Sequence, residues 1–138
     1  MNDQKRHLIS VNPDLRDRFG HYLNYDLRLR TAAQALGFEF STLANQAIDA
    51  TLLDRFVLPT FSNNSWTAGR FRKPGVIDAF ARELRESVER TRSGRDTQKH
   101  YFMYLGSIAH AAAILQVAAE TSEAENHYRI NLFYSFRR

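Results

Sequence analysis

The fold is decided by residues 7–45, which read HLISVNPDLRDRFGHYLNYDLRLRTAAQALGFEFSTLAN. The apolar run at 7–12 stops at a proline and is typical of a buried strand. Residues 21–36 follow with apolar side chains at three- and four-residue spacing, which predicts a helix. Gly37 then stands where a helix commonly ends, because glycine adopts positive φ without strain. A second apolar run at 38–44 completes a strand–helix–strand unit.

The helix expected over 21–36 has more apolar side chains on one side than on the others, and they form a continuous stripe. We expect that stripe to face the core, and its members are Tyr25, Leu29, Ala32, Ala33 and Leu36.

The alternation of strand and helix continues to the end of the chain. Pro59 lies in the third expected strand, and because proline has no N–H to donate, that strand belongs at a sheet edge. The expected elements are a weak helix at 46–54, a strand at 56–61, a helix from Pro74 to about 92, a strand at 101–105, an alanine-rich helix at 108–120 and a strand at 129–134.

Strands separated by helices imply right-handed crossovers and a parallel sheet. The sequence therefore predicts an α/β fold: a single Rossmann-like three-layer domain over 1–138, with a five-stranded parallel sheet in the order 3-2-1-4-5 and helices on both faces. In that order the winding reverses between the first and fourth strands. Ligands bind such sheets in the crevice at this switch point, beyond the carboxyl ends of the strands.

Composition excludes several classes of protein. The 138 residues are 43% hydrophobic and 25% charged, which is ordinary for a globular domain. The absence of cysteine excludes disulfide scaffolds, thiolate metal sites and a cysteine nucleophile. No apolar stretch is long enough to span a bilayer, and the polar N-terminus has no secretory pattern. We expect a soluble, cytoplasmic protein.

Positive charge gathers in residues 70–99, which account for the formal net charge of +4. Arginine outnumbers lysine sixteen to three. Arginine suits bidentate contact with phosphate or carboxylate, but a GC-rich genome produces the same bias. Because a few units of charge do not make a nucleic-acid footprint, nucleic acid is not expected as a partner.

Common catalytic and cofactor motifs are missing from the sequence. It contains no G-x-G-x-x-G after the first strand and no phosphate-binding G-x-x-x-x-G-K-[ST], which disfavours dinucleotide enzymes and P-loop NTPases. The histidines have no metal-ligand spacing, and G-x-S-x-G is absent. We therefore expect no metal and no cofactor, and assign no catalytic residue.

The candidate substrate-binding residues flank the predicted crevice or lie in a polar loop. Gly20 and His21 stand at a helix entrance, where free N–H groups attract anions, although they also suit a turn and a solvated first turn. Ser107 can equally be the N-cap of the alanine-rich helix, and Trp66 can stack on a sugar or fold back onto the core. The full set is Gly20, His21, Tyr104, Gly106, Ser107 and Trp66.

Residues 19–45 resemble the opening of GT-B-type glycosyltransferases. That family begins with a strand, a glycine-containing loop that often reads Gly-His, a helix, and a second strand of the form ALxxxGHEVxVLA. Here Phe38 replaces the histidine of the second motif, and the loop has one glycine in place of two or three. Residues 104–107 and 130–134 also look like later strands of the family.

The resemblance implies the N-terminal, acceptor-side half of a transferase that uses a nucleotide-sugar donor, as in polysaccharide biosynthesis. In that family a second domain holds the donor nucleotide, and residues 1–138 contain nothing of it, so the chain is expected to be either a fragment of a longer enzyme or a stand-alone relative. The partners implied are therefore the donor, through that missing domain, and a sugar or glycan acceptor. By analogy Gly20 would face the donor phosphates or the acceptor, and His21 would line the cleft. The isolated chain is expected to be inactive.

Two other readings compete with this one. A non-catalytic Rossmann-like module would bind a ligand or a protein partner through the same crevice. A weaker alternative is an anionic-polymer binder that uses the arginine-rich segment 70–99.

Overall fold

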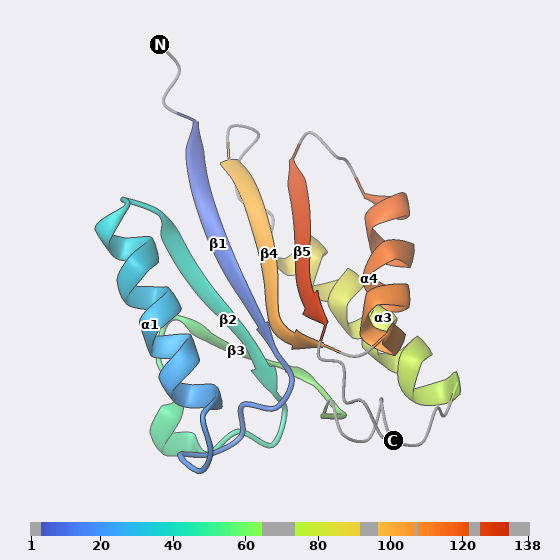
Figure 1. Ribbon diagram of the computed structural model, residues 1–138, viewed down its shortest axis with the longest axis horizontal. Helices are drawn as coiled ribbons and strands as arrows, with labels where there is room; N and C mark the ends of the chain where they lie inside the picture. The colour runs from blue at the N-terminus through green and yellow to red at the C-terminus, as the bar shows by residue number, and fades with distance from the viewer. Residues whose placement is uncertain (1–3, 65–73, 92–96, 107, 122–124, 133–138) are drawn as a thin grey trace.

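The computed structural model describes residues 4–64, 74–91, 97–106, 108–121 and 125–132, and Figure 1 shows their arrangement. Five strands form one all-parallel sheet in the order β3-β2-β1-β4-β5, so the predicted α/β topology is confirmed. The strands are β1 (Lys5–Asn12), β2 (Glu39–Asn45), β3 (Val57–Phe61), β4 (Thr97–Gly106) and β5 (Asn126–Leu132).

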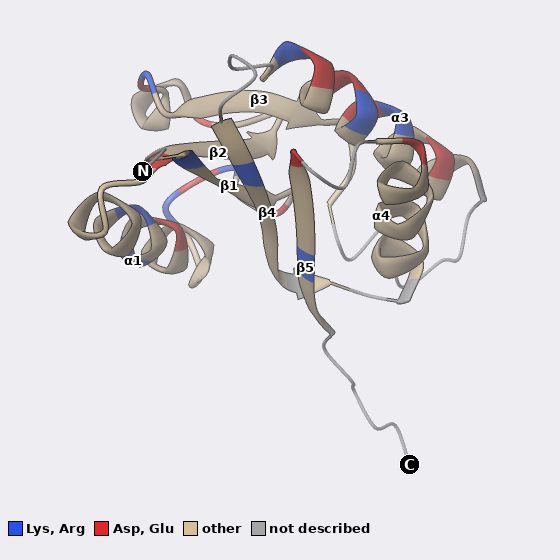
Figure 2. Ribbon diagram, turned by 90° about the horizontal axis from the view of Figure 1, so that it is seen from above, with Lys and Arg blue, Asp and Glu red and all other residues tan. Residues whose placement is uncertain are grey.

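Helices lie on both faces of the sheet. Helix α1 (Tyr22–Ala35) packs on one face, against β1 and β2. Helices α3 (Pro74–Arg90) and α4 (Ile108–Glu120) pack against each other on the opposite face, as the two views show (Figures 1 and 2). Apart from the short connection after β2, the predicted elements and the observed ones agree to within a few residues.

The main core fills the space between the sheet and the α3–α4 pair. Strand side chains alternate between the two faces, and those on this face are almost fully buried. Phe61 of β3 stacks on Phe80 of α3 with ring centroids 4.9 Å apart. The core includes Ile9, Val11, Leu43, Phe61, Phe80, Leu84, Val88, Tyr101, Met103, Ile114 and Val117.

The side of α1 that faces the sheet differs from the predicted stripe. Its buried residues are Asp26 and Ala33, whereas Leu36 is 71% exposed. The Thr42 hydroxyl on β2 donates a hydrogen bond of 2.6 Å to the Asp26 carboxylate. The predicted stripe is therefore right for Ala33 but wrong for Leu36, because a carboxyl group with a hydrogen-bond partner in the sheet takes the central position.

Helix α1 ends in a Schellman motif, as Gly37 predicts. The N–H of Phe38 donates to the carbonyl of Ala33 at 2.9 Å, and the N–H of Gly37 donates to that of Gln34 at 3.1 Å. Gly37 has a φ of 74°, which a side chain would disfavour. The motif turns the chain directly from α1 into β2.

The helix predicted over 46–54 does not form. This connection contains only a single 3₁₀ turn, Ala50–Leu52. The Asp49 carboxylate accepts a hydrogen bond from the backbone N–H of Thr51, and the Asn45 side-chain oxygen accepts one from Ala47. Such local side-chain bonds compete with helical ones, and here they replace the helix with successive turns.

Strand β3 lies at one edge of the sheet, as Pro59 predicts. At the edge only one side of the strand must pair, so the missing proline N–H is tolerated.

The arginine-rich segment 70–99 is not a uniformly basic surface where it is described. Helix α3 carries Lys or Arg and Asp or Glu side by side (Figure 2). Arg85 pairs with Glu120 of α4, with one N–O distance of 3.2 Å, and Lys99 is buried. The described part of the segment therefore gives no support to anionic-polymer binding.

Within the described residues, no helix has both the length and the apolar character needed to cross a bilayer.

We expect Leu84→Ala to lower the free energy of unfolding by about 2–5 kcal/mol, because it opens a cavity in a close-packed core. Leu84 is 0% exposed and lies in the α3 face of the main core. Urea titration followed by circular dichroism measures the change. Leu115→Ala is the control: this α4 residue is 71% exposed, and its replacement should change stability by less than about 0.5 kcal/mol. Equal effects of the two substitutions would contradict this packing.

Candidate functional site

The carboxyl ends of β1 and β4 lie side by side at the centre of the sheet. From β1 the chain passes to α1 on one face, and from β4 it passes to α4 on the other (Figure 1). The two connections therefore diverge at this point, which is the place of the predicted crevice and where ligands bind in sheets of this kind.

The loop between β1 and α1 is held by hydrogen bonds from the neighbouring β2–β3 connection. The Asn45 side chain donates to the carbonyl of Pro13 at 3.0 Å, and the Asn45 backbone N–H donates to that of Leu15 at 3.2 Å. At the end of β1, the Asn12 side chain donates to the carbonyl of Tyr22 at 3.3 Å. These bonds fix where α1 begins.

Gly20 and His21 stand at the entrance of α1, as predicted. Gly20 has a φ of 78°, which explains why a glycine is needed there. His21 is the N-cap residue of α1, but its side chain makes no capping hydrogen bond. Its exposed ring instead lies against the rings of Tyr22 and Tyr25, with centroids 4.5 and 5.1 Å away.

Tyr25 and Tyr104 join the two sides of the crevice. Tyr25 lies in the early turns of α1 and Tyr104 near the end of β4, and their rings stack with centroids 4.1 Å apart and planes 26° from parallel. A side-chain hydrogen bond with Tyr25 raises the pKa of Tyr104. Tyr104 is 37% exposed, so part of this aromatic surface remains accessible.

A buried carboxyl group lies next to this aromatic pair. Asp26, directly after Tyr25, is 1% exposed. Burial raises its pKa, while the Thr42 and Ser10 side chains on the sheet partly offset that effect. This residue positions α1 on the sheet and thereby sets the place of Tyr25. The sequence analysis missed it because a lone aspartate in a helix is usually read as a solvated residue.

Gly106, another predicted site residue, is buried in packing contacts. A Cβ at this position would lie 2.9 Å from Cγ1 of Ile130 and 3.1 Å from Sδ of Met103. Close packing therefore explains why position 106 is a glycine. Its predicted contact with a ligand stays a prediction.

Two predicted site residues, Trp66 and Ser107, lie outside the described residues. The structure therefore brings together Gly20, His21 and Tyr104 from the predicted set and adds Tyr22 and Tyr25 to them. Among the residues described, no cluster of three or more His, Asp or Glu side chains could hold a metal ion.

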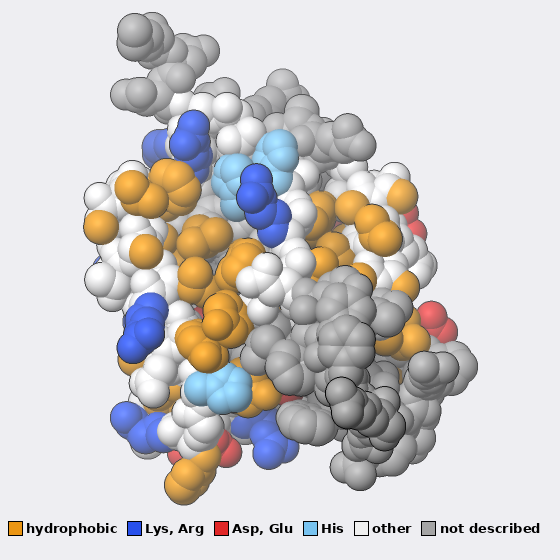
Figure 3. All heavy atoms as spheres, in the orientation of Figure 1, with side chains coloured by type: hydrophobic (Ala, Val, Ile, Leu, Met, Phe, Trp, Pro, Cys, Tyr) orange, Lys and Arg blue, Asp and Glu red, His pale blue; other side chains and the backbone are white. Residues whose placement is uncertain are grey.

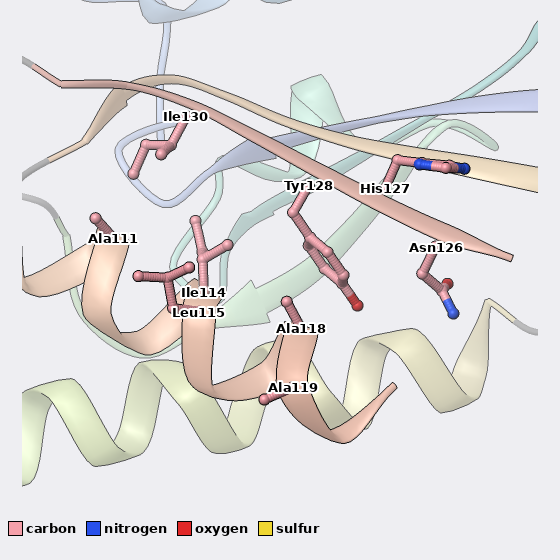
Figure 4. Close-up of a pocket in the computed structure, with 9 residues that line it drawn as sticks. All are labelled: Ala111, Ile114, Leu115, Ala118, Ala119, Asn126, His127, Tyr128 and Ile130. Atoms are coloured by element: carbon pink, nitrogen blue, oxygen red, sulfur yellow. The ribbon is translucent and has the colours of Figure 1, made fainter. Parts of the chain in front are cut away.

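A hollow of about 650 Å³ lies away from the crevice, between α4 and the edge strand β5. Figure 4 shows Tyr128 pointing from β5 toward Ala118 of α4. The wall is mostly apolar, and its polar members come from the start of β5. The lining residues are Ala111, Ile114, Leu115, Ala118, Ala119, Asn126, His127, Tyr128 and Ile130. The sequence analysis did not find this hollow, because it depends on how far α4 stands from the sheet edge.

Compared with models of protein families, with curated proteins and with solved structures, the chain gives no match. Its function has to be argued from the arrangement of its own residues.

Gly106→Ala should lower the free energy of unfolding by about 1–3 kcal/mol, because the new methyl group overpacks the contact with Ile130. Gly75→Ala in α3 is the matched control, since nothing lies within 4 Å of a Cβ there, and in a helix it should be neutral or stabilising by up to about 1 kcal/mol. Urea titration of both variants measures the difference. A Gly106→Ala protein as stable as the parent would show that the site has free space.

Asp26 should give the protein a pH-dependent stability. Because its pKa is raised in the folded state from the ordinary 3.8, the folded protein keeps a proton that the unfolded chain has lost. The free energy of unfolding should therefore fall as pH rises from about 3.8 to the raised pKa. The Asp26→Asn variant has no carboxyl group to titrate at this position, so its free energy of unfolding should change less with pH in this range. Urea titration at a series of pH values measures the difference.

Asp78→Asn, an exposed carboxyl group on α3, is the control and should keep the parent's slope. The account of Asp26 is wrong if both variants follow the parent over this pH range.

Proposed function

We propose that this chain is a ligand-binding Rossmann-like domain whose crevice between β1 and β4 receives a sugar or a nucleotide-type ligand. The observation that carries this proposal is the stacked pair of Tyr25 and Tyr104, which joins the start of α1 to the end of β4. It lies at the switch point where sheets of this order bind ligands.

The chemistry of the aromatic group suits a ring-shaped polar ligand. Aromatic faces stack on the flat apolar side of a sugar or on a base, while phenol and imidazole groups hydrogen-bond to its polar edge. His21 and Tyr104 both combine a flat ring with such a polar group, and both are exposed. Gly20 adopts its positive φ without strain and, because it has no side chain, leaves room for a ligand to approach the backbone.

A more specific form of the proposal follows from the resemblance of residues 19–45 to GT-B-type glycosyltransferases. In this form the domain binds the acceptor, and a separate domain supplies the nucleotide-sugar donor. Sugar transfer requires donor and acceptor to be held in line, and orientation provides much of the rate. The 138-residue chain by itself should therefore bind without transferring sugar. A non-catalytic ligand-binding module is the alternative that uses the same crevice.

Binding should be tested by NMR on isotopically labelled protein, titrated with a panel of mono- and disaccharides and with uridine and guanosine diphosphate sugars. The expected result is a set of saturable backbone shifts centred on Gly20, His21, Tyr25 and Tyr104. Tyr104→Ala should weaken binding about tenfold, the equivalent of 1.4 kcal/mol, because it removes one face of the stack.

Leu58→Ala is the matched control, because Leu58 is 39% exposed but lies on the edge strand β3. It should leave the affinity unchanged. Shifts centred on the hollow between α4 and β5, or equal affinity of the Tyr104→Ala protein, would refute the proposed site. Turnover of a nucleotide sugar by this chain alone would refute the acceptor-side form.

A further inference from the structure

Helix α1 covers only half of its face of the sheet. It packs on β1 and β2 and reaches β4 on this face through the stacking of Tyr25 on Tyr104 at the end of that strand. No described helix lies over the remainder of this face of β4 and β5 (Figure 1). The side chains on this face can be identified because successive residues of a strand point to opposite faces of the sheet. The parallel register of β4 and β5 pairs His100 with His127 and Phe102 with Arg129. We call this surface the open face and define it by Arg6, Gln98, His100, Phe102, His127 and Arg129.

Two imidazole rings lie at the centre of the open face. His100 and His127 stack with centroids 5.0 Å apart and planes 16° from parallel. The Gln98 side chain bonds to both, at 3.2 Å to Nε2 of His100 and 2.9 Å to Nε2 of His127. The pair thus forms a flat aromatic surface that is held in place by a neighbouring side chain.

Positive charge surrounds this pair. Burial first, and then the charges of His127, Arg6 and Arg129, lower the pKa of His100. The two arginines are exposed, and the described residues of β1, β4 and β5 that alternate onto this face include no Asp or Glu. Figure 3 shows histidine and Lys or Arg side chains gathered over the upper part of the sheet, with hydrophobic side chains below them.

We propose that the open face binds single-stranded nucleic acid. Proteins that bind such strands combine cationic groups for the phosphates with aromatic side chains on which the bases stack. Here Arg6 and Arg129 supply the charge, while Phe102 and the stacked His100–His127 pair supply the flat surfaces. Alternate residues of a strand stand about 6.6 Å apart, so the rings along β4 are spaced for successive bases.

Charge complementarity decides between this occupant and a second copy of the chain. Two copies packed through the open face would bring the like charges of Arg6 and Arg129 together. The strand residues described on this face include no carboxylate to offset them, the nearest along β5 being the exposed Glu125 directly before the strand. A polyanion without bases would contact the arginines but not the aromatic rings. Replacing an aromatic ring therefore distinguishes it from a single-stranded nucleic acid.

The test measures binding of a fluorescently labelled oligothymidine of roughly ten nucleotides to the full chain by fluorescence anisotropy, over a range of salt concentrations. Two arginine–phosphate contacts predict a slope of log K against log salt of about −1.4, since each contact on a single strand contributes about −0.7. Arg129→Gln should make the slope shallower by about 0.7. Arg82→Gln, on exposed α3 across the sheet, should leave it unchanged.

Phe102→Ala should weaken binding between about fivefold and a hundredfold, because it removes a stacking surface, and should leave the salt slope unchanged. Leu115→Ala on α4 is its control, and circular dichroism checks that both variants fold. The Phe102 ring lies edge-on to that of Tyr104, with centroids 6.4 Å apart. Crevice binding of Phe102→Ala is therefore measured separately, with the sugar panel, and should equal the parent's.

Three outcomes would overturn the proposal. One is the absence of binding at low salt, and another is equal affinity for duplex DNA of the same length. The third is a Phe102→Ala protein that binds as tightly as the parent while heparin competes fully, which would make the open face a general polyanion surface. A loss of affinity in Phe102→Ala and a shallower slope in Arg129→Gln would together support it.

Discussion

One hydrogen bond, from the Thr42 hydroxyl to the buried Asp26 carboxylate, fixes the layer that carries the candidate site. The side of α1 toward the sheet has two fully buried residues, Asp26 and Ala33, and at the start of the helix Tyr22 and Leu23 pack against a small apolar cluster. A buried carboxyl group has a high cost if its partner is lost. Together with that apolar contact, the bond holds α1 in one position on the sheet, in which Tyr25 stacks on Tyr104.

Much of the fold could be predicted from the sequence because its signals are local. Proline and glycine mark strand ends and helix ends through their own backbone chemistry, as Pro59 and Gly37 show, and alternating elements permit few topologies. The helix expected at 46–54 failed for an equally local reason. The Asn45 and Asp49 side chains bond to the backbone two residues later, and apolar spacing does not reveal that competition.

Less of the candidate site could be predicted. The crevice and its glycine at position 20 follow from topology, but the stacking of Tyr25 on Tyr104 joins residues that are far apart in sequence. The open face was hidden for the same reason: its charges are spread over the first and last strands, so a count along the chain points to segment 70–99 instead. Only the parallel register places Arg6, His100 and Arg129 on one surface.

The position of β1 at the centre of the sheet has a consequence for how the chain folds during synthesis. One edge of β1 pairs with β2, which follows closely, but the other pairs with β4, where Lys5 lies beside Thr97. Until β4 leaves the ribosome, the backbone groups along that second edge have no strand to bond. Pairings between distant segments form slowly, and unpaired strand edges promote association between chains. Synthesis of residues 13–96 is therefore the interval in which one edge of the central strand is exposed to pairing with other chains.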